Sequence, residues 1–543
     1  MIRAAAALLV ASVLVVFGLR PGAATTPVNL VRLDPTFGNG GLITYDIGGP
    51  GPGGPNTDHE DEPYWYAIQP DGNIVLAGKA HNPGVNGSMD FAALRFHSNG
   101  TLDTSFGWGG VVLVDFLGAW DEALSVALQP DGKLVFAGLA GRPNGNADVG
   151  LVRLNANGSR DTTFGWNGLV MTDFFGLKDQ ALGVAVLPDG KIVAAGYATR
   201  PTSGSDLALL RYNPSGGLDK TFGVGGVSIA DYWGKTDALY KLTVQPDGKL
   251  LGTGIATRPD GSTDFAVARF DANGAPDNTF GWGGRVATDF FGKSDLGLSL
   301  LLLPDGKIVA GGLAFNPATN SQDLALAKFN ANGSTDTSFG AAPRPGLVTT
   351  DFFGLYDQAL WLALQPDGKI FTFGHSKHPV RSFEFAMTRF TPSGTLDPSF
   401  GVGGHVSTDF YGGPDGIHAG ALFPDGTALA IGDAYNPASN SDDFALARYL
   451  IADPSWIAGV ASSMPSSAFA PGQQSAVLAA LNSAQASVTN GNAAGSLATM
   501  QDLRTHLDAC PAAPDGNDWI IVCAQQQQVR TLVDQVIAKL STP

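Results

Sequence analysis

The chain of 543 residues carries 49 acidic and 32 basic side chains, a formal charge of −17 that repels a phosphate backbone, so nucleic-acid binding is not expected. Only 15% of the residues are charged and 44% are hydrophobic, which excludes an extended, disordered chain. The 72 glycines and 34 prolines indicate a globular fold rich in tight turns.

The N-terminus has the order of features typical of a secretory signal. Arg3 precedes an apolar run over residues 4–17, and small residues follow at 21–24. Residues 1–24 are therefore predicted to be cleaved, and the protein is expected in the periplasm, at the cell surface or outside the cell. The apolar run is shorter than the roughly 20 residues of a membrane span, and no other stretch qualifies, so no transmembrane segment is expected after cleavage.

An acidic loop follows the first strand-like segment. The insertion 48–55 leads into Asp58, Glu60, Asp61 and Glu62, whose oxygens could bind calcium. The spaced acids and central glycine of a calcium-binding hand are missing, so the alternative is a solvated acidic loop. No other cofactor is expected.

Two landmarks recur seven times with a period near 58 residues, which predicts a repeat domain over residues 25–450. The phenylalanine of a Phe-Gly pair stands at Phe37, Phe106, Phe164, Phe222, Phe280, Phe339 and Phe400. The aspartate of a Pro-Asp-Gly turn stands at Asp71, Asp131, Asp189, Asp247, Asp305, Asp367 and Asp425.

Each unit contains four strand-length apolar runs, such as 168–172, 181–186, 191–195 and 207–212. The Pro-Asp-Gly turn predicts a hairpin, which makes its flanking strands antiparallel. Seven such units fit a seven-bladed β-propeller of four-stranded antiparallel blades, because radial repetition leaves only short sheet edges. A parallel β-helix is the main alternative, but it needs no tight hairpin in every coil. The segments 41–45 and 444–449 bracket a whole number of units, so the chain ends could meet to close the ring.

The sequence around these landmarks resembles a known repeat. Residues 102–110, Leu-Asp-Thr-Ser-Phe-Gly-Trp-Gly-Gly, and 127–138, Ala-Leu-Gln-Pro-Asp-Gly-Lys-Leu-Val-Phe-Ala-Gly, are similar to the delta-60 repeat of secreted, mostly bacterial proteins. The resemblance covers about residues 30–450. It implies a propeller-like fold, and because the family has no established general activity, it indicates nothing specific about chemistry.

Several polar residues keep the same place in every unit. The aspartates Asp61, Asp121, Asp179, Asp237, Asp295, Asp357 and Asp415 could gather cations on one rim, but binding to nearby backbone N–H groups is favoured. In the final run of each unit an acid precedes a base by five residues, as in Asp148 and Arg153. This odd spacing points the two side chains to opposite faces, so we expect pairing with neighbouring blades or turn carbonyls instead.

The residue before a recurring loop proline suggests a ligand site. Arg142, Arg200 and Arg258 hold this place in three successive units and His378 in a later one. Such an arc of arginines would suit a carboxylate, a sulfate or an acidic glycan, although ordinary surface arginines are the alternative.

Other side chains gave weaker signals. His375, His405 and His418 could form a histidine cluster with His378, but nothing in the sequence fixes their geometry. Trp108, Trp166 and Trp282, in the turn after Phe-Gly, could stack on sugars if exposed, and packing between blades is expected instead.

After residue 450 the repeat stops. A linker over 451–472 is expected to precede a small helical unit over 473–543, whose apolar residues recur at helical spacing. Cys510 and Cys523, the only cysteines, are predicted to form a disulfide across the second helix connection.

These features favour an exported, non-enzymatic protein that binds an acidic glycan, a small anion or a protein partner on one loop face. The first alternative is a propeller hydrolase, lactonase-like or glycan-cleaving, with its site at the mouth of the central channel. The second is a structural spacer on the cell surface. An enzyme should gather histidine and acid from several blades at the channel mouth, and no catalytic motif is found in the sequence.

Overall fold

The structure is a computed structural model that describes residues 28–47, 61–82, 88–202, 204–507, 518–520 and 522–541. The predicted signal peptide, the candidate calcium ligands Asp58 and Glu60, and Cys510 lie outside these residues. The signal peptide and the disulfide therefore stay predictions. None of the helices in the described ranges is long and apolar enough to cross a membrane.

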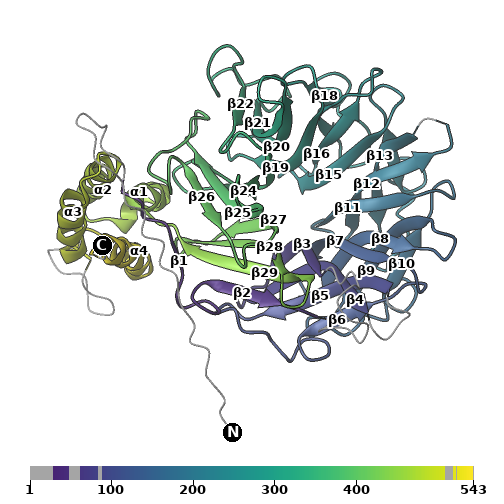
Figure 1. The fold of residues 1–543 in the computed structure, drawn as a ribbon, viewed down its shortest axis with the longest axis horizontal. Helices are drawn as coiled ribbons and strands as arrows, with labels where there is room; N and C mark the ends of the chain where they lie inside the picture. The colour runs from purple at the N-terminus through teal and green to yellow at the C-terminus, as the bar shows by residue number, and fades with distance from the viewer. Residues whose placement is uncertain are drawn as a thin grey trace, which may run out of the picture.

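Seven antiparallel sheets stand around a central axis like the blades of a propeller (Figure 1), which confirms the predicted fold class. Six blades contain four consecutive strands each. They are blade 1, β3 (Glu62–Ile68), β4 (Ile74–Asn82), β5 (Ser88–Phe96) and β6 (Val111–Val114); blade 2, β7 (Asp121–Leu128), β8 (Leu134–Gly141), β9 (Ala147–Leu154) and β10 (Leu169–Thr172); blade 3, β11 (Asp179–Val186), β12 (Ile192–Arg200), β13 (Gly204–Tyr212) and β14 (Val227–Ala230); blade 4, β15 (Asp237–Val244), β16 (Leu250–Thr257), β17 (Thr263–Phe270) and β18 (Arg285–Thr288); blade 5, β19 (Asp295–Leu302), β20 (Ile308–Asn316), β21 (Ser321–Phe329) and β22 (Leu347–Thr350); and blade 6, β23 (Asp357–Leu364), β24 (Ile370–Lys377), β25 (Phe383–Phe390) and β26 (His405–Thr408).

Blade 7 combines both ends of the repeat region. It contains β27 (Asp415–Leu422), β28 (Thr427–Asn436) and β29 (Ser441–Leu450), and its fourth strand is β2 (Leu42–Tyr45), with Leu42 opposite Ala447 on β29. The short β1 (Arg32–Leu33) pairs with the end of β29. Pairing between the two ends confirms that they close the ring.

The first strand of each blade lies nearest the axis and sets the two faces of the molecule (Figure 1). It begins at the recurring aspartate and ends at the Pro-Asp-Gly hairpin, where Gly190, for example, has φ +81° and donates its N–H to the Leu187 carbonyl at 2.9 Å. We call the two sides of the ring the aspartate face and the hairpin face.

The recurring aspartates bind backbone N–H groups, as expected. Asp121 is fully buried, and its Oδ2 accepts a hydrogen bond from the Phe116 N–H at 2.9 Å. The equivalent bond from the preceding loop is made to Asp61, Asp179, Asp237, Asp295, Asp357 and Asp415. Each aspartate therefore fixes the loop that leads into its inner strand.

The recurring bases join each blade to the next. The Nε of Arg153 donates to Asp161 at 2.8 Å, and its Nη1 donates to the Pro214 carbonyl of the next blade at 2.5 Å. Its guanidinium also lies over the buried ring of Phe164, 4.5 Å from the centroid. We call these contacts of the recurring base the clasp. They confirm the predicted pairing of the bases with neighbouring blades and turn carbonyls.

Four helices follow blade 7 at one edge of the ring (Figure 1). They are α1 (Pro454–Ser463), α2 (Gln473–Thr489), α3 (Ala493–Thr505) and α4 (Cys523–Ser541), with a short 3-10 turn, η1 (Ser466–Ala468), after α1. The stretch expected to be a linker thus contains α1 and η1. Trp456 of α1 is 1% exposed and shares a hydrophobic core with Phe371 and Phe400 of blade 6, so the helices pack against the propeller.

Candidate functional site

A bulge in every inner strand points one extra side chain into the central channel. The pairing of β7 with β8 shifts by one residue between Ala123 and Ser125, which leaves Leu124 unpaired, and the other six blades show the same shift. A recurring glycine makes room for the bulge, since a Cβ at Gly138 would lie 1.8 Å from the Glu122 carbonyl oxygen. The repeat therefore builds a ring of bulged side chains around the axis.

These side chains line one cavity of about 140 Å³, which we call the cup. Its wall consists of the seven bulged residues and its floor includes Trp65 and Lys241, giving the set Tyr64, Trp65, Leu124, Leu182, Tyr240, Lys241, Leu298, Leu360 and His418. Four of the bulged residues are leucines. The polar exceptions, Tyr64, Tyr240 and His418, come from blades 1, 4 and 7.

The floor of the cup is an aromatic cage around one amine. Trp65 and Trp361 meet edge to face with their ring centroids 4.7 Å apart. Lys241 reaches them from blade 4, with its Nζ 3.8 Å from the Trp65 ring centroid and 4.3 Å from that of Trp361. Burial lowers the pKa of Lys241 to about 7. The amine therefore titrates near neutral pH.

The mouth of the channel on the aspartate face departs from sevenfold symmetry. The residue after each recurring aspartate is paired with a residue on the second strand of its blade, and the two side chains lie on the same face of the sheet. In blades 6, 7, 1, 2 and 3 these pairs carry polar groups, Gln358–His375, Gly416–Asp433, Glu62–Lys79, Glu122–Leu139 and Gln180–Tyr197. In blades 4 and 5 they are apolar, Ala238–Ile255 and Leu296–Leu313. One side of the mouth is thus polar and the other is apolar.

Blade 7 supplies a histidine–carboxylate pair. His418 Nε2 and Asp433 Oδ1 are 2.5 Å apart. Burial opposes a charged imidazole, but the hydrogen bond and charge of Asp433 raise the pKa of His418 above its ordinary value. His375 of blade 6 lies beside them, because a Cβ on Gly416 would be within 3.7 Å of His375, His418 and Asp433 alike. Burial and the charge of His418 lower the pKa of His375 to about 4.

Blade 1 places a tyrosine next to this pair. The Tyr64 ring packs edge to face against His418, with centroids 5.4 Å apart, and its hydroxyl donates to Glu62 Oε2 at 2.5 Å. Lys79 Nζ lies 3.5 Å from the same carboxylate oxygen. Burial and the charge of Glu62 raise the pKa of Tyr64, so the phenol stays protonated. Acid, base and aromatic groups from three blades therefore meet at one mouth.

The histidines noted in the sequence separate into two pairs. His375 and His418 lie at the channel mouth, whereas His378 and His405 pack against Phe353, with ring centroids 5.1 and 6.0 Å away. Burial lowers the pKa of His405 to about 4. Only the first pair adjoins the cup.

The predicted arginine arc is largely neutralised by acids of its own blades. Arg142 binds Asp148, with Nε–Oδ2 at 2.7 Å, and Arg258 contacts Asp264 and Asp289 at 2.8 and 3.1 Å. Arg200 forms the same ion pair with Asp206. A hollow of about 450 Å³ on the aspartate face includes Arg142 and lies beside the mouth; it is also lined by Trp120, Glu122 and Lys178. Ligand binding by the arginines stays a prediction.

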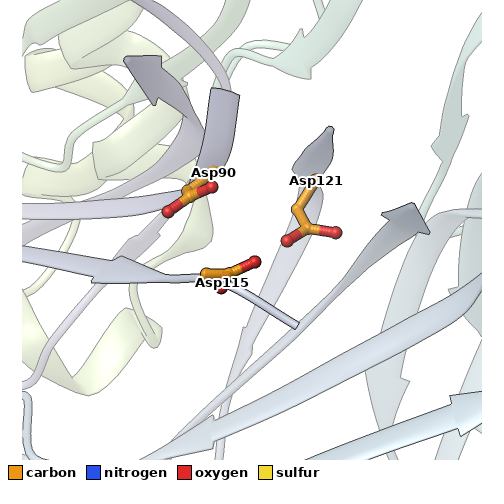
Figure 2. Close-up of side chains that lie close together, drawn as sticks. All are labelled: Asp90, Asp115 and Asp121. Carbon is orange, nitrogen blue, oxygen red and sulfur yellow. The ribbon is translucent and has the colours of Figure 1, made fainter. Parts of the chain in front are cut away.

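Carboxylates gather where blades meet. Figure 2 shows Asp90, Asp115 and Asp121 turned toward one another, and one oxygen from each lies within 4.8 Å of the others. The same arrangement joins Asp264, Asp289 and Asp295. Arg258 forms ion pairs with Asp264 and Asp289, whereas Asn82 and Ser88 donate to Asp90. Such groups could hold a metal ion.

The two described members of the predicted acidic calcium site have different roles. Asp61 is buried and accepts the Ile47 N–H at 2.7 Å, as its equivalents do in other blades. Glu62 belongs to the channel mouth, where it contacts Tyr64 and Lys79. Calcium binding by this loop stays a prediction.

The expectation that the turn tryptophans pack between blades is wrong. Trp108, Trp166 and Trp282 are 94%, 79% and 72% exposed. Each stands in a tight turn and projects its indole from the tip of that turn. At Trp108, for example, the backbone N–H donates to the Val111 carbonyl at 2.9 Å.

Several residues at the channel escaped sequence reasoning, above all Lys241, Trp65, Trp361 and Asp433. The sequence did contain a signal for three of them. At the inner-strand position of Trp65, Lys241 and Trp361, the other blades have serine, glycine or alanine, so these three residues depart from the repeat. The channel-facing register depends on the bulge, and the bulge has no sequence marker except the recurring glycine. Departures from the repeat were thus the useful clue.

Six stretches of the chain match a family model described as "Domain of unknown function (DUF5122) beta-propeller": residues 69–106, 129–164, 187–222, 245–280, 303–339 and 365–400. Each runs from a Pro-Asp-Gly hairpin to the next Phe-Gly landmark. The seventh hairpin, at Asp425, is not followed by its Phe-Gly landmark in the sequence. That landmark is Phe37, near the other end of the chain, and the pairing of β2 with β29 brings it to the same blade. The matches support a repeat family of β-propellers.

A comparison with curated proteins finds no match. Among solved structures, polysaccharide lyase Uly1 is 10% identical with TM-score 0.42 and covers 79% of this chain and 100% of its own. A protein of unknown function from Dyadobacter fermentans is 14% identical with TM-score 0.37, covering 61% and 94%. A putative glucose dehydrogenase from Thermus thermophilus is 17% identical with TM-score 0.34, covering 61% and 94%. Likenesses this distant say nothing about ligand or reaction.

Proposed function

We propose that the protein is an exported binding protein whose ligand enters the cup through the mouth on the aspartate face. The observation that carries this proposal is the loss of sevenfold symmetry at that mouth, where blades 6, 7, 1, 2 and 3 carry polar pairs and blades 4 and 5 do not. A repeat needs the same residues in every blade for its fold, so polar groups present in only some blades serve another purpose.

The site has the composition of a ligand pocket. Leu124, Leu182, Leu298 and Leu360 form an apolar wall, while Tyr64, Tyr240, Lys241 and His418 add a few convergent polar groups. The hollow at Trp120 and Arg142 offers a continuation for a longer ligand, which keeps an acidic glycan and a small anion among the candidates.

Thermal unfolding with a panel of small organic acids, sugars and acidic oligosaccharides tests the proposal. A ligand at 100 times its Kd stabilises the native state by roughly 2.7 kcal/mol and raises Tm. We expect such a shift for the wild type, and we expect His418→Asn to reduce it because that variant removes a side chain from the cup wall.

His97→Asn provides the matched control, since His97 is a half-exposed histidine near the hairpin face that hydrogen bonds to Asn73 at 3.1 Å. This variant should keep the full shift. A shift that both variants retain would place the ligand elsewhere, and no shift with any ligand would favour the structural spacer.

A second function is favoured by one specific contact. The His418–Asp433 pair, 2.5 Å apart, stands beside the protonated phenol of Tyr64. A carboxylate that orients an imidazole next to a phenol provides a general base and a general acid for hydrolysis. The hydrolase therefore stands as the alternative to the binding protein.

Turnover of aryl esters, lactones and acidic polysaccharides tests the hydrolase. Loss of a general base typically lowers the rate about 100-fold or more, so His418→Asn should do so while His97→Asn has no effect. A wild-type protein without turnover, or a His418→Asn variant with full turnover, would contradict the hydrolase and leave binding as the proposed function.

A further inference from the structure

We propose that the cup selects a carboxylate, which forms an ion pair with Lys241 Nζ at its floor; this inference rests on the proposed binding function. The first step is that, among the described residues, the amine forms no ion pair. Its Nζ lies over the faces of Trp65 and Trp361, 3.8 and 4.3 Å from their ring centroids. Indole faces attract a cation but accept no strong hydrogen bond, so the amine retains its capacity to donate to an anionic oxygen.

A second donor comes from the same strand as Lys241. The bulge between Leu239 and Lys241 lets two consecutive side chains, Tyr240 and Lys241, face the cup together. Burial raises the pKa of Tyr240, so its hydroxyl remains a donor. A carboxylate has two oxygens and only accepts hydrogen bonds when ionised, which matches an ammonium and a phenol that face one cavity.

The remaining polar groups of the cup already have partners. Tyr64 donates to Glu62, and His418 is paired with Asp433. These two acids lie toward the mouth and are compensated there by Tyr64, Lys79 and His418. The two cup donors without a hydrogen-bond partner among the described residues, Tyr240 and Lys241, thus both come from the inner strand of blade 4.

The volume of the cup limits the ligand. A volume of about 140 Å³ is close to the roughly 150 Å³ of an apolar protein cavity that binds one benzene molecule. It admits a small monocarboxylate or the acidic end of a longer molecule. Leucines on blades 2, 3, 5 and 6 exclude water from the pair, which strengthens its attraction.

Calorimetric titration at pH 6.5 with matched pairs of probes tests this proposal: acetate against acetamide, lactate against lactamide, and D-glucuronate against D-glucose. A charge-assisted bond should make the acid of at least one pair bind about tenfold or more tightly than its neutral counterpart. Lys241→Met, which keeps the length of the side chain, should abolish this preference. Lys178→Met, at the neighbouring hollow, should retain it.

The pH profile identifies which group supplies the charge. Lys241 titrates near pH 7 in the free protein, so acid binding should weaken by about tenfold per pH unit above that point. His418 and Tyr64 also face the cup, Lys79 and Glu62 lie at the mouth, and the charge of His418 would fade over an overlapping range. The slope above pH 7 should therefore persist in His418→Asn and vanish in Lys241→Met.

The possible failures can be told apart. If acid and neutral probes bind equally and His418→Asn weakens both, the cup binds ligands but the carboxylate assignment is wrong. If Lys241→Met keeps the acid preference, the assignment is wrong as well. If no probe binds, the carboxylate assignment is wrong, and the thermal-shift panel decides separately whether the proposed binding function is wrong as well. Should Lys241→Met fail to fold, Tyr240→Phe must still lower the acid preference severalfold without changing affinity for the neutral probes.

Discussion

Asp453→Ala is expected to lower the free energy of unfolding by about 4 kcal/mol, an effect at the upper end for one side chain. Asp453 is 2% exposed and lies between blade 6 and the helical unit, where it pairs with the 1% exposed Arg389 at 2.7 Å. Its Oδ1 also accepts the Trp456 N–H at 2.9 Å and so caps α1. The substitution would leave a buried guanidinium short of one partner and remove the cap.

The reason for this large effect is the way in which blade 6 departs from the repeat. In blades 1 to 4 the clasp arginine reaches a turn carbonyl of the next blade, as Arg211 does with Ala272 at 2.5 Å. For Arg389 of blade 6 the next blade is blade 7, where the chain leaves β29 for α1, and the Asp453 carboxylate takes the place of that turn carbonyl. Burial opposes its charge, but Arg389 and Lys369 hold the pKa of Asp453 well below its usual range.

Denaturant unfolding followed by tryptophan fluorescence measures this loss. Asp453→Asn serves as a matched variant, because an amide oxygen can still cap α1 while the charge is gone. It should therefore lose less than Asp453→Ala. A loss below about 1 kcal/mol for the alanine variant would contradict the role assigned to this pair.

The propeller is expected to be more stable near pH 5.5 than at pH 8, with Tm higher by on the order of 5 °C. The cause is the set of buried aspartates at the starts of the inner strands. Burial, reinforced in all seven by neighbouring carboxylates, raises the pKa of Asp179 to about 6, of Asp121, Asp237, Asp295, Asp357 and Asp61 to about 7, and of Asp415 to about 8.

The direction follows from proton binding. An unfolded aspartate has a pKa near 3.9, so between about pH 4 and pH 7 the folded chain binds more protons and loses stability as the pH rises. His375 and His405 act in the opposite direction, since burial lowers the pKa of each to about 4 and protonation below pH 6.5 favours unfolding. Lys241 and Lys539, whose pKa burial lowers to about 7, add stability only above that pH. Seven aspartates outweigh these four groups over the stated range.

Thermal unfolding across pH 4.5 to 8.5 provides the measurement, and Asp295→Asn tests the assigned cause. Asp295 faces Asp264 and Asp289, with Arg258 close to both, and its Oδ1 has no hydrogen-bond partner among the described atoms. The amide removes one titrating group, so the variant should lose less stability between pH 5.5 and 8. Asp305→Asn, at an exposed hairpin, should behave as the wild type, and a Tm that rises steadily to pH 8 would show that other groups dominate.

The sequence by itself determined the architecture of this protein. Seven copies of Pro-Asp-Gly and Phe-Gly set the number of blades, because a hairpin turn is a local property of the residues in it, such as Gly190 at φ +81°. Helical spacing likewise placed α2, α3 and α4, since amphipathic periodicity is readable within one segment.

Only the tertiary structure decided the site. Trp65, Lys241 and Trp361 are more than 100 residues apart and meet because ring closure brings blades 1, 4 and 6 around one axis. Whether an inner-strand side chain faces the channel depends on a one-residue bulge, which the two-residue period of a strand does not reveal. The exposure of Trp108 and the pairing of Arg142 with Asp148 were decided in the same way, by neighbours supplied by the folded blade. A repeat predicts the structure that its copies share. The residues that depart from the repeat can be recognised as one site only after the closed ring places them next to one another.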